Sequence, residues 1–363
     1  MTKKCFASII RGMKKIGFAA FIAPIIILLL SVDGFAHEKW FTETGGHHLR
    51  WDLYFKPLPL IFTAAILVVT AIGWFVWNKR KASFVPGPKE LGATDERRSA
   101  FYGLVPMILG LHLAVPLFVG AVQAELFSPN NKLTGIWIYF VGLALTGIAL
   151  SFFYGALTRL SAVAMAIIWV LGIFIVGLES MLDNIFYLGF AAFFYCVGRG
   201  PISIDRLIIP KLEPRADLMK LGVPLLRVGI GLSLIIVAFT EKLANLPLAE
   251  KFLVDHPLNF TSFFGIPMSN ELFILCAGSV ELLVGLWILL GIFPREIILI
   301  AWIPINMTLT IFNWTELVGH LPIYGALAVL LVWSADEDNL KLWIKGLREG
   351  PLKIESTASP TDA

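Results

Sequence analysis

The sequence predicts an all-α, polytopic integral membrane protein, with about nine transmembrane helices after an N-terminal signal or anchor and with two tandem four-helix bundles. Hydrophobic residues make up 57% of the 363 positions and charged residues only 15%, against roughly 45–50% and 25% in soluble domains. The mean hydropathy is +0.80. The apolar residues form continuous runs of about 20, as in membrane-spanning helices, and not the short alternating strands of a barrel. The net charge of +3 gives no reason to expect a nucleic-acid partner.

Residues 1–36 have the pattern of an export signal. A basic start precedes an apolar core from Ile16 to Leu30, and Gly34 and Ala36 provide the small residues that precede a cleavage site. An uncleaved signal anchor fits the same residues, because the apolar stretch is just long enough to span. Both alternatives stay open at this point.

The following segment, residues 37–57, is polar and is expected outside the cytoplasm. His37, His47 and His48 make it a weak candidate for a metal site. Cleavage after Ala36 would give His37 a free amine, and an amine and an imidazole together can bind copper. The alternative is a solvated segment whose aromatic residues lie at the membrane interface.

Residues 58–98 are expected to form the first membrane helix of the main body and a cytoplasmic linker. A first four-helix module follows at 101–198, a second linker at 199–220, a second module at 221–335 and a cytoplasmic tail at 336–363. The nine apolar segments are Leu58–Trp77, Phe101–Gln123, Gly135–Ala156, Leu160–Leu178, Ile185–Gly198, Leu221–Thr240, Glu271–Phe293, Ile297–Trp314 and Leu317–Trp333.

The distribution of basic residues predicts the topology. With residues 1–15 in the cytoplasm and alternating spans, 22 of the 29 Lys and Arg residues fall on the cytoplasmic side and six outside, and Arg227 lies within a helix. Cytoplasmic loops of membrane proteins carry such an excess. The C-terminus is therefore expected in the cytoplasm.

The two modules resemble each other. A shift of 137 residues aligns WTELVGHLPIYG with GLESMLDNIFYLG, and a Val-Pro pair occurs early in each module. This indicates a tandem duplication with parallel topology, although chance similarity between apolar sequences is the alternative. The shift places Glu316, His320 and Tyr324 on Glu179, Asp183 and Tyr187.

Polar residues within apolar segments are the candidate site residues. Glu281 lies at the centre of its span, where a carboxylate must face protein or water. Arg227 either reaches the cytoplasmic surface or pairs with Glu281 or a bound anion. Asn306 lies near mid-membrane, as a helix contact or a ligand contact. Three residues at the outer end of the last helix, Glu316, His320 and Tyr324, form an interface cap or a proton-handling group.

Three short motifs share their spacing with a known family. They are Arg227-x-x-x-Gly231, Lys242-Leu243, and Glu281-x-x-x-Gly285 followed by Leu289-Leu290-Gly291. On these motifs, residues 221–335 resemble the DoxX family of four-helix membrane modules. Phe239 departs from the pattern, because the family usually has a glycine three residues before the lysine, and this puts the placement of Lys242 in doubt.

The resemblance implies a bacterial inner-membrane protein, since DoxX members are similar to the membrane subunits of thiosulfate:quinone oxidoreductase. It implies redox, respiratory or detoxification chemistry, with quinone as the candidate cofactor and a redox protein as the candidate partner beside the lipid bilayer. The catalytic candidates are Glu281, His320, Glu316 and Tyr324, and the ligand-binding candidates are Arg227, Asn306 and Lys242. A non-catalytic membrane partner and a small-solute transporter are the alternative functions.

Overall fold

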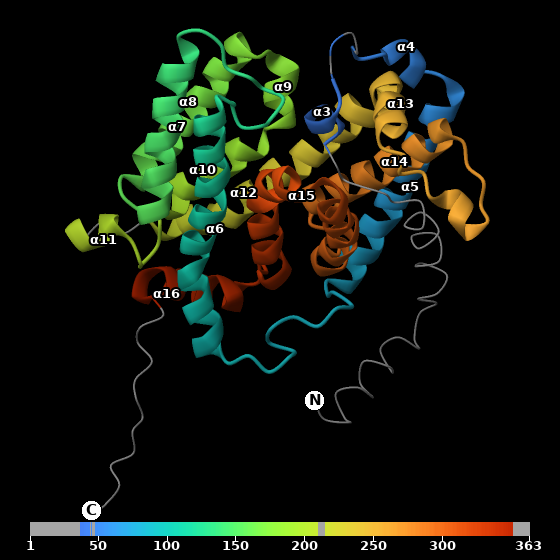
Figure 1. Ribbon diagram of the computed structural model, residues 1–363. Helices are drawn as coiled ribbons and strands as arrows, with labels where there is room; N and C mark the ends of the chain where they lie inside the picture. The colour runs from blue at the N-terminus through green and yellow to red at the C-terminus, as the bar shows by residue number, and fades with distance from the viewer. Residues whose placement is uncertain (1–36, 44, 46–47, 210–214, 351–363) are drawn as a thin grey trace, which may run out of the picture. The chain divides into compact units, whose positions relative to one another are not determined.

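The computed structural model describes residues 37–43, 45, 48–209 and 215–350 (Figure 1). The predicted signal or anchor, His47 and the end of the tail lie outside these residues. The described chain is all-α, with no strand in it beyond a single bridge between Glu125 and Lys132. Eight helical stretches in it are long and apolar enough to cross a membrane, two of them within the single helix Pro294–Val332. The fold class is confirmed: this is a multi-pass, helical membrane protein.

Two compact units divide the chain, and each contains segments distant in sequence. Among the described residues, the first unit comprises those from 37 to 85 together with 231–317, and the second comprises those from 86 to 230 together with 318–350. Two long helices, α12 (Ala216–Val237) and α15 (Pro294–Val332), contribute to both units. These two units are defined by contacts and not by the predicted repeat. The division into modules at 101–198 and 221–335 therefore stays a prediction.

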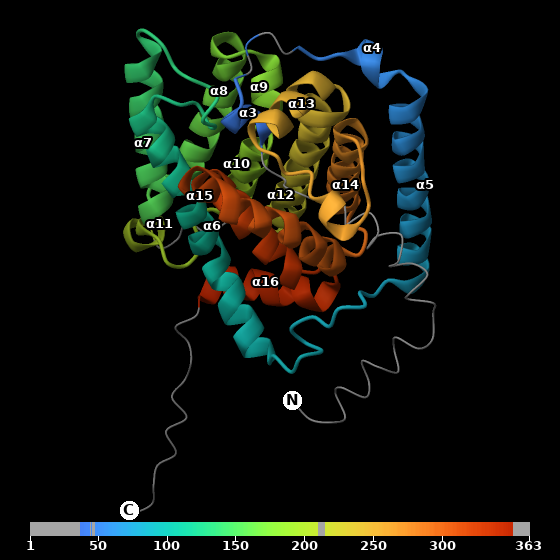
Figure 2. The same ribbon diagram turned by 45° about the vertical axis from the view of Figure 1, so that its right-hand side comes forward.

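The first unit holds the N-terminal segment and much of the C-terminal half. Its helix α5 (Pro57–Arg80) lies alongside α14 (Asn270–Leu290) (Figure 2), and the Gly73 backbone there lies against the Trp287 ring. The outer side of α5 is apolar and exposed, as expected for a helix that faces lipid, with Ile61, Leu67 and Val68 all more than half exposed. The elements wholly within this unit are α3 (Glu38–Phe41), α4 (Trp51–Tyr54), α5 (Pro57–Arg80), the π-helix η1 (Ala238–Leu243), α13 (Leu246–Asp255), the 3₁₀-helix η2 (Thr261–Phe264) and α14 (Asn270–Leu290).

Gly231 and Gly285, two glycines of the sequence motifs, lie where α12 crosses α14 within the first unit. A Cβ on Gly231 would lie 2.7 Å from the Leu289 nitrogen, and one on Gly285 would lie 3.1 Å from the Gly231 oxygen. Small residues of this kind let two membrane helices approach closely. The Gly231 and Gly285 positions of the motifs thus have a packing role.

The second unit is built around α6 and α10. Its C-terminal helix α16 packs on α6, where the backbones approach closely because both Gly103 and Gly346 lack side chains. Trp343 of α16 is fully buried and donates from its indole nitrogen to the Met219 oxygen at 2.9 Å. The helices wholly within this unit are α6 (Asp95–Gln123), α7 (Trp137–Tyr154), α8 (Thr158–Ile175), α9 (Leu178–Asp183), α10 (Phe186–Val197), α11 (Ile204–Ile208) and α16 (Glu337–Glu349).

Three predicted spans differ from the helices observed. The fifth predicted segment corresponds to α10, which has only 12 residues. The last two predicted segments lie on one continuous helix, α15, of 39 residues. No glycine or proline separates Phe312 from Leu317, so nothing in the local sequence ends the helix between the two apolar stretches.

Candidate functional site

Glu281 is buried in the first unit with 3% of its surface exposed. It therefore faces protein, as its position in the middle of an apolar helix requires. Its carboxylate lies 3.2 Å from the Lys242 ammonium, both side chains being about 4% exposed. The alternative in which Arg227 pairs with Glu281 is thus replaced by a pair with Lys242. Lys242 and Glu281, which belong to two different short motifs of the sequence, therefore meet in the fold.

A π-helix carries Lys242 and the residue before it. In η1 the backbone bonds run from i to i+5, and such wider turns recur at functional sites of other proteins. Both Glu241 and Lys242 are buried, at 1% and 3% exposure. Two consecutive charged side chains are therefore held away from solvent at the end of an apolar helix.

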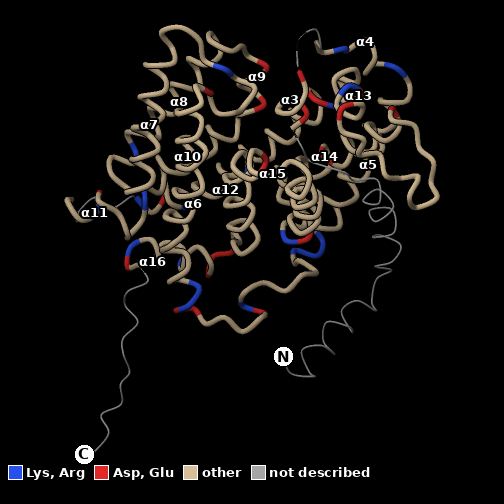
Figure 3. The backbone as a smooth tube through the Cα atoms, in the orientation of Figure 1, with Lys and Arg blue, Asp and Glu red and all other residues tan. Residues whose placement is uncertain are grey.

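The segment around α3 brings further charges to the same place. The Glu241 carboxylate accepts a hydrogen bond from the Glu38 backbone nitrogen at 2.6 Å and lies 3.2 Å from Nδ1 of His37. The Glu38 carboxylate lies 3.6 Å from the Lys242 ammonium. Figure 3 shows charged positions gathered beside α3 and α13. We call the set His37, Glu38, Glu241, Lys242, Glu281 and Glu316 the charge cluster.

Aromatic stacking fixes α3 in the first unit. The His37 ring stacks on Trp40 with ring centres 4.2 Å apart, and Phe41 stacks on Phe312 of α15 at the same distance. His37 and Glu38 are 8% and 4% exposed. The expectation of a solvated segment is thus wrong for its first residues, because their aromatic neighbours anchor them in the bundle.

Glu316 completes the cluster from α15. It is fully buried, and its charge interacts with His37, Glu241 and Lys242. His320 and Tyr324 follow on the same helix at intervals of four residues, His320 being 2% exposed and Tyr324 partly buried. Because α15 is continuous there, the predicted spacing along one helix holds for this triplet.

The corresponding triplet of the first module is arranged differently. Glu179 and Asp183 belong to α9, whereas Tyr187 belongs to α10, and the α-helix is interrupted between them. The Tyr187 hydroxyl donates to the Phe127 oxygen at 3.1 Å. The internal repeat stays a prediction, and these three residues do not share one helix.

The pKa values of His37 and Glu38, the two N-terminal members of the cluster, are both raised. Burial raises the pKa of the Glu38 carboxyl to about 8, although the Lys242 charge opposes the shift. Burial lowers the pKa of the His37 imidazole, but the charge and hydrogen bond of Glu241 raise it by more, so the net pKa is raised. The Glu38 carboxyl therefore changes protonation near neutral pH, which is what proton transfer requires.

The remaining predicted residues lie apart from these contacts. Asn306 is exposed and donates to the Trp302 oxygen of its own helix at 2.6 Å. Arg227 belongs to the second unit, where it is partly buried and its Nε has no hydrogen-bond partner among the described residues. His48 is exposed. No group of three or more His, Cys, Asp or Glu side chains in the described chain is arranged to hold a metal ion.

Sequence reasoning missed Glu38 and Glu241. Glu241 ends an apolar span, where a charged residue ordinarily reaches the surface. Glu38 lies in a segment whose polar composition predicts exposure. The one available signal is the aromatic pair Trp40 and Phe41, which begins four residues after Ala36, because such a pair favours burial.

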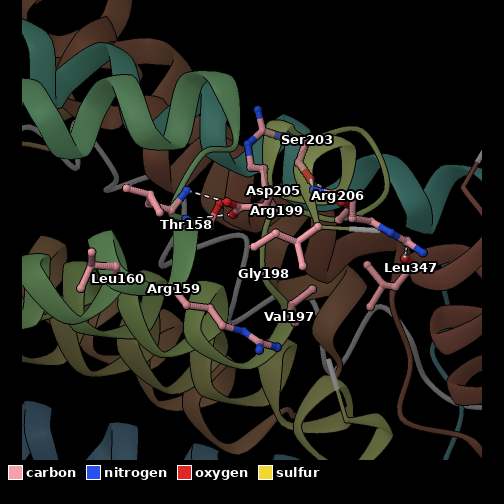
Figure 4. Close-up of a pocket in the computed structure, with 13 residues that line it drawn as sticks. Thr158, Arg159, Leu160, Val197, Gly198, Arg199, Ser203, Asp205, Arg206 and Leu347 are labelled. Atoms are coloured by element: carbon pink, nitrogen blue, oxygen red, sulfur yellow. Dashed lines mark hydrogen bonds between the residues drawn. The ribbon is translucent and has the colours of Figure 1, made fainter. Parts of the chain in front are cut away.

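A pocket of about 220 Å³ lies in the second unit beside the turn between α7 and α8 (Figure 4). Its charged residues mainly support that turn. Asp205 accepts hydrogen bonds from the backbone nitrogens of Leu157 and Thr158, and Arg199 donates to the oxygens of Phe152 and Phe153. In Figure 4 the side chains of Arg159, Arg199 and Arg206 point in different directions. They do not converge on one point, so we place the candidate site at the charge cluster.

Comparison with known proteins adds no relative. No protein-family model, curated protein or solved structure matches the chain. The candidate site therefore rests on its own geometry.

Proposed function

We propose that this protein is a DoxX-like inner-membrane protein of bacteria, linked to quinone and associated with redox chemistry in respiration or detoxification. In this proposal the charge cluster takes up and releases protons, and a redox protein partner supplies electrons. Reduction of a quinone consumes two electrons and two protons, so a membrane protein in this role needs a buried proton donor. The cytoplasmic placement of the C-terminus belongs to the same proposal and derives from the charge distribution.

The composition of the cluster is the observation that carries the proposal. Four buried glutamates, Glu38, Glu241, Glu281 and Glu316, are each at most 4% exposed. Ionising all of them in a buried site is costly unless each is compensated, so protonation of one carboxyl is the less costly state. A buried carboxyl that shares its proton with neighbours is suited to proton transfer.

Quinone binding tests the proposal directly. The purified protein in lipid nanodiscs is titrated with a short-chain ubiquinone, with tryptophan quenching as the signal. We expect saturable quenching that falls in the Trp40→Phe variant, since Trp40 stacks on His37 of the cluster. We also expect Glu281→Gln to bind quinone while exchanging fewer protons with a pH-indicator dye.

Glu43→Gln is the matched control, because Glu43 is an exposed glutamate of the same segment. It should leave both signals unchanged. Quenching that never saturates, or that is identical in Trp40→Phe, would contradict a quinone site at the cluster. In that case, quinone reduction found only in a co-purified partner would favour the non-catalytic role.

A further inference from the structure

The charge cluster has more buried acids than cations. Four glutamates face two lysines, because Lys39 is also buried and interacts with Glu241. The Oε2 atom of Glu38 is buried and has no hydrogen-bond donor among the described residues. The Glu38 carboxylate can thus accept a hydrogen bond from one more donor.

The α-nitrogen of His37 is already placed beside these carboxylates. The next backbone nitrogen, that of Glu38, donates to Oε2 of Glu241 at 2.6 Å. Successive backbone nitrogens are at most about 3.7 Å apart, so the His37 α-nitrogen lies within about 6 Å of that oxygen. The His37 side chain is fixed to the same carboxylate through Nδ1.

The residues just before His37 match the pattern cut during export. Gly34 and Ala36 are the small residues that a signal peptidase requires at the third and first positions before its cleavage site, after the apolar core from Ile16 to Leu30. Cleavage there would make His37 the first residue. The predicted cleavage site and the buried cluster are thus adjacent in the chain.

We infer that cleavage between Ala36 and His37 completes the charge cluster, by creating an α-ammonium group at His37 that pairs with its buried carboxylates. A membrane-bound signal peptidase catalyses the hydrolysis. Water adds its hydroxyl to the Ala36 carbonyl carbon, the peptide C–N bond breaks, and the His37 nitrogen gains one proton to become an amine and a second to become ammonium. The new ammonium then adds a positive charge beside the Glu241 carboxylate, to which the Glu38 backbone nitrogen and the His37 ring already bond.

The inference resolves the alternative between signal and anchor in favour of cleavage. It also differs from copper binding by the same amine and imidazole, because Nδ1 of His37 already bonds a carboxylate. It goes beyond the proposed function and holds whether or not a quinone binds. Its consequence is that the export machinery supplies a group of the mature site.

Mass spectrometry of the full-length gene product, expressed with its own leader and purified from membranes, tests the first step. We expect the intact mass of a chain that begins at His37. The second step is the reactivity of the new amine towards an N-hydroxysuccinimide acetate ester at pH 7.5, measured on the N-terminal peptide. We expect labelling at least tenfold slower in the folded protein than in denatured protein.

Two variants connect the slow labelling to the cluster. Glu241→Gln should speed the labelling of the His37 amine severalfold, whereas Glu43→Gln should leave it unchanged. Ala36→Tyr should block cleavage and lower the thermal unfolding temperature in detergent, which keeps the test decisive if Glu241→Gln fails to fold. A mature chain that retains residues 1–36, an amine labelled as fast as in denatured protein, or stoichiometric copper that is lost in His37→Ala would each overturn the inference.

Discussion

At the scale of single residues, the Lys242 ammonium is the least replaceable group of the cluster. It lies within 3.6 Å of the Glu38 carboxylate and 3.2 Å of the Glu281 carboxylate, and all three side chains are at most 5% exposed. Removing one partner of a buried ion pair leaves the other charge uncompensated, at a cost of roughly 3–5 kcal/mol. The pair is therefore better tested by a double-mutant cycle than by single changes.

We expect Lys242→Gln and Glu281→Gln each to lower the thermal unfolding temperature in detergent, and the double variant to recover much of the loss. Lys251→Gln is the control, because Lys251 forms its ion pair with Asp255 at the surface, where such pairs contribute about 0–1 kcal/mol. Strictly additive losses in the double variant would show that the two residues are not energetically coupled.

Glu38 gives the cluster a pH dependence with a definite sign. Its pKa of about 8 lies above the ordinary value near 4.5, so the folded protein binds a proton that the unfolded chain releases. Stability therefore falls as pH rises from about 4.5 to about 8, by at most about 1.4 kcal/mol per pH unit. The raised pKa of His37 acts in the same direction, since its contribution is lost as pH rises through the folded value.

Thermal unfolding between pH 5.5 and pH 8 measures this slope. The wild-type protein should become less stable with rising pH, and Glu38→Gln should flatten the curve. The exposed Glu43→Gln variant should keep the wild-type slope. A wild-type protein that gains stability over this range would show that Glu38 is ionised in the folded state.

At the scale of elements, the crossing of α12 and α14 depends on two glycines. We expect Gly285→Ala to destabilise the protein by roughly 1–3 kcal/mol, because its Cβ would lie 2.9 Å from the Ile235 backbone nitrogen. Gly147→Ala in α7 meets nothing within 4 Å, so it should be neutral or stabilising, as alanine favours a helix over glycine. Equal unfolding temperatures for the two variants would show that α12 and α14 separate without cost.

The elements also show what the sequence could and could not predict. Apolar length predicted the membrane helices and the burial of Glu281 correctly, since both follow from the cost of exposing polar groups to lipid. Composition could not predict the burial of Glu38, because that depends on Trp40 and Phe41 finding a tertiary surface near Phe312. Nor could it predict that α15 continues past Phe312, since apolar windows measure hydropathy and not backbone continuity.

At the scale of the whole molecule, topology remains a prediction. The excess of Lys and Arg on one side predicts that reporter fusions after Lys81, Arg206 and Ala363 lie in the cytoplasm and that fusions after Asn131 and Asp255 lie outside. Alkaline phosphatase and fluorescent-protein fusions at these five sites test it. Phosphatase activity at Arg206 would reverse the orientation of the second linker and require a different number of spans in the first half of the chain.

The pairing of His37 with Glu241 joins positions 204 residues apart. At a synthesis rate of about 5–20 residues per second, the start of the first unit waits roughly 10–40 s before its partner leaves the ribosome. The whole of α6 to α10 is made during that interval. The first unit therefore cannot complete its fold in the order of synthesis. In an incomplete chain that stops before residue 241, α3 lacks the Glu241 carboxylate to which it bonds in the full-length protein.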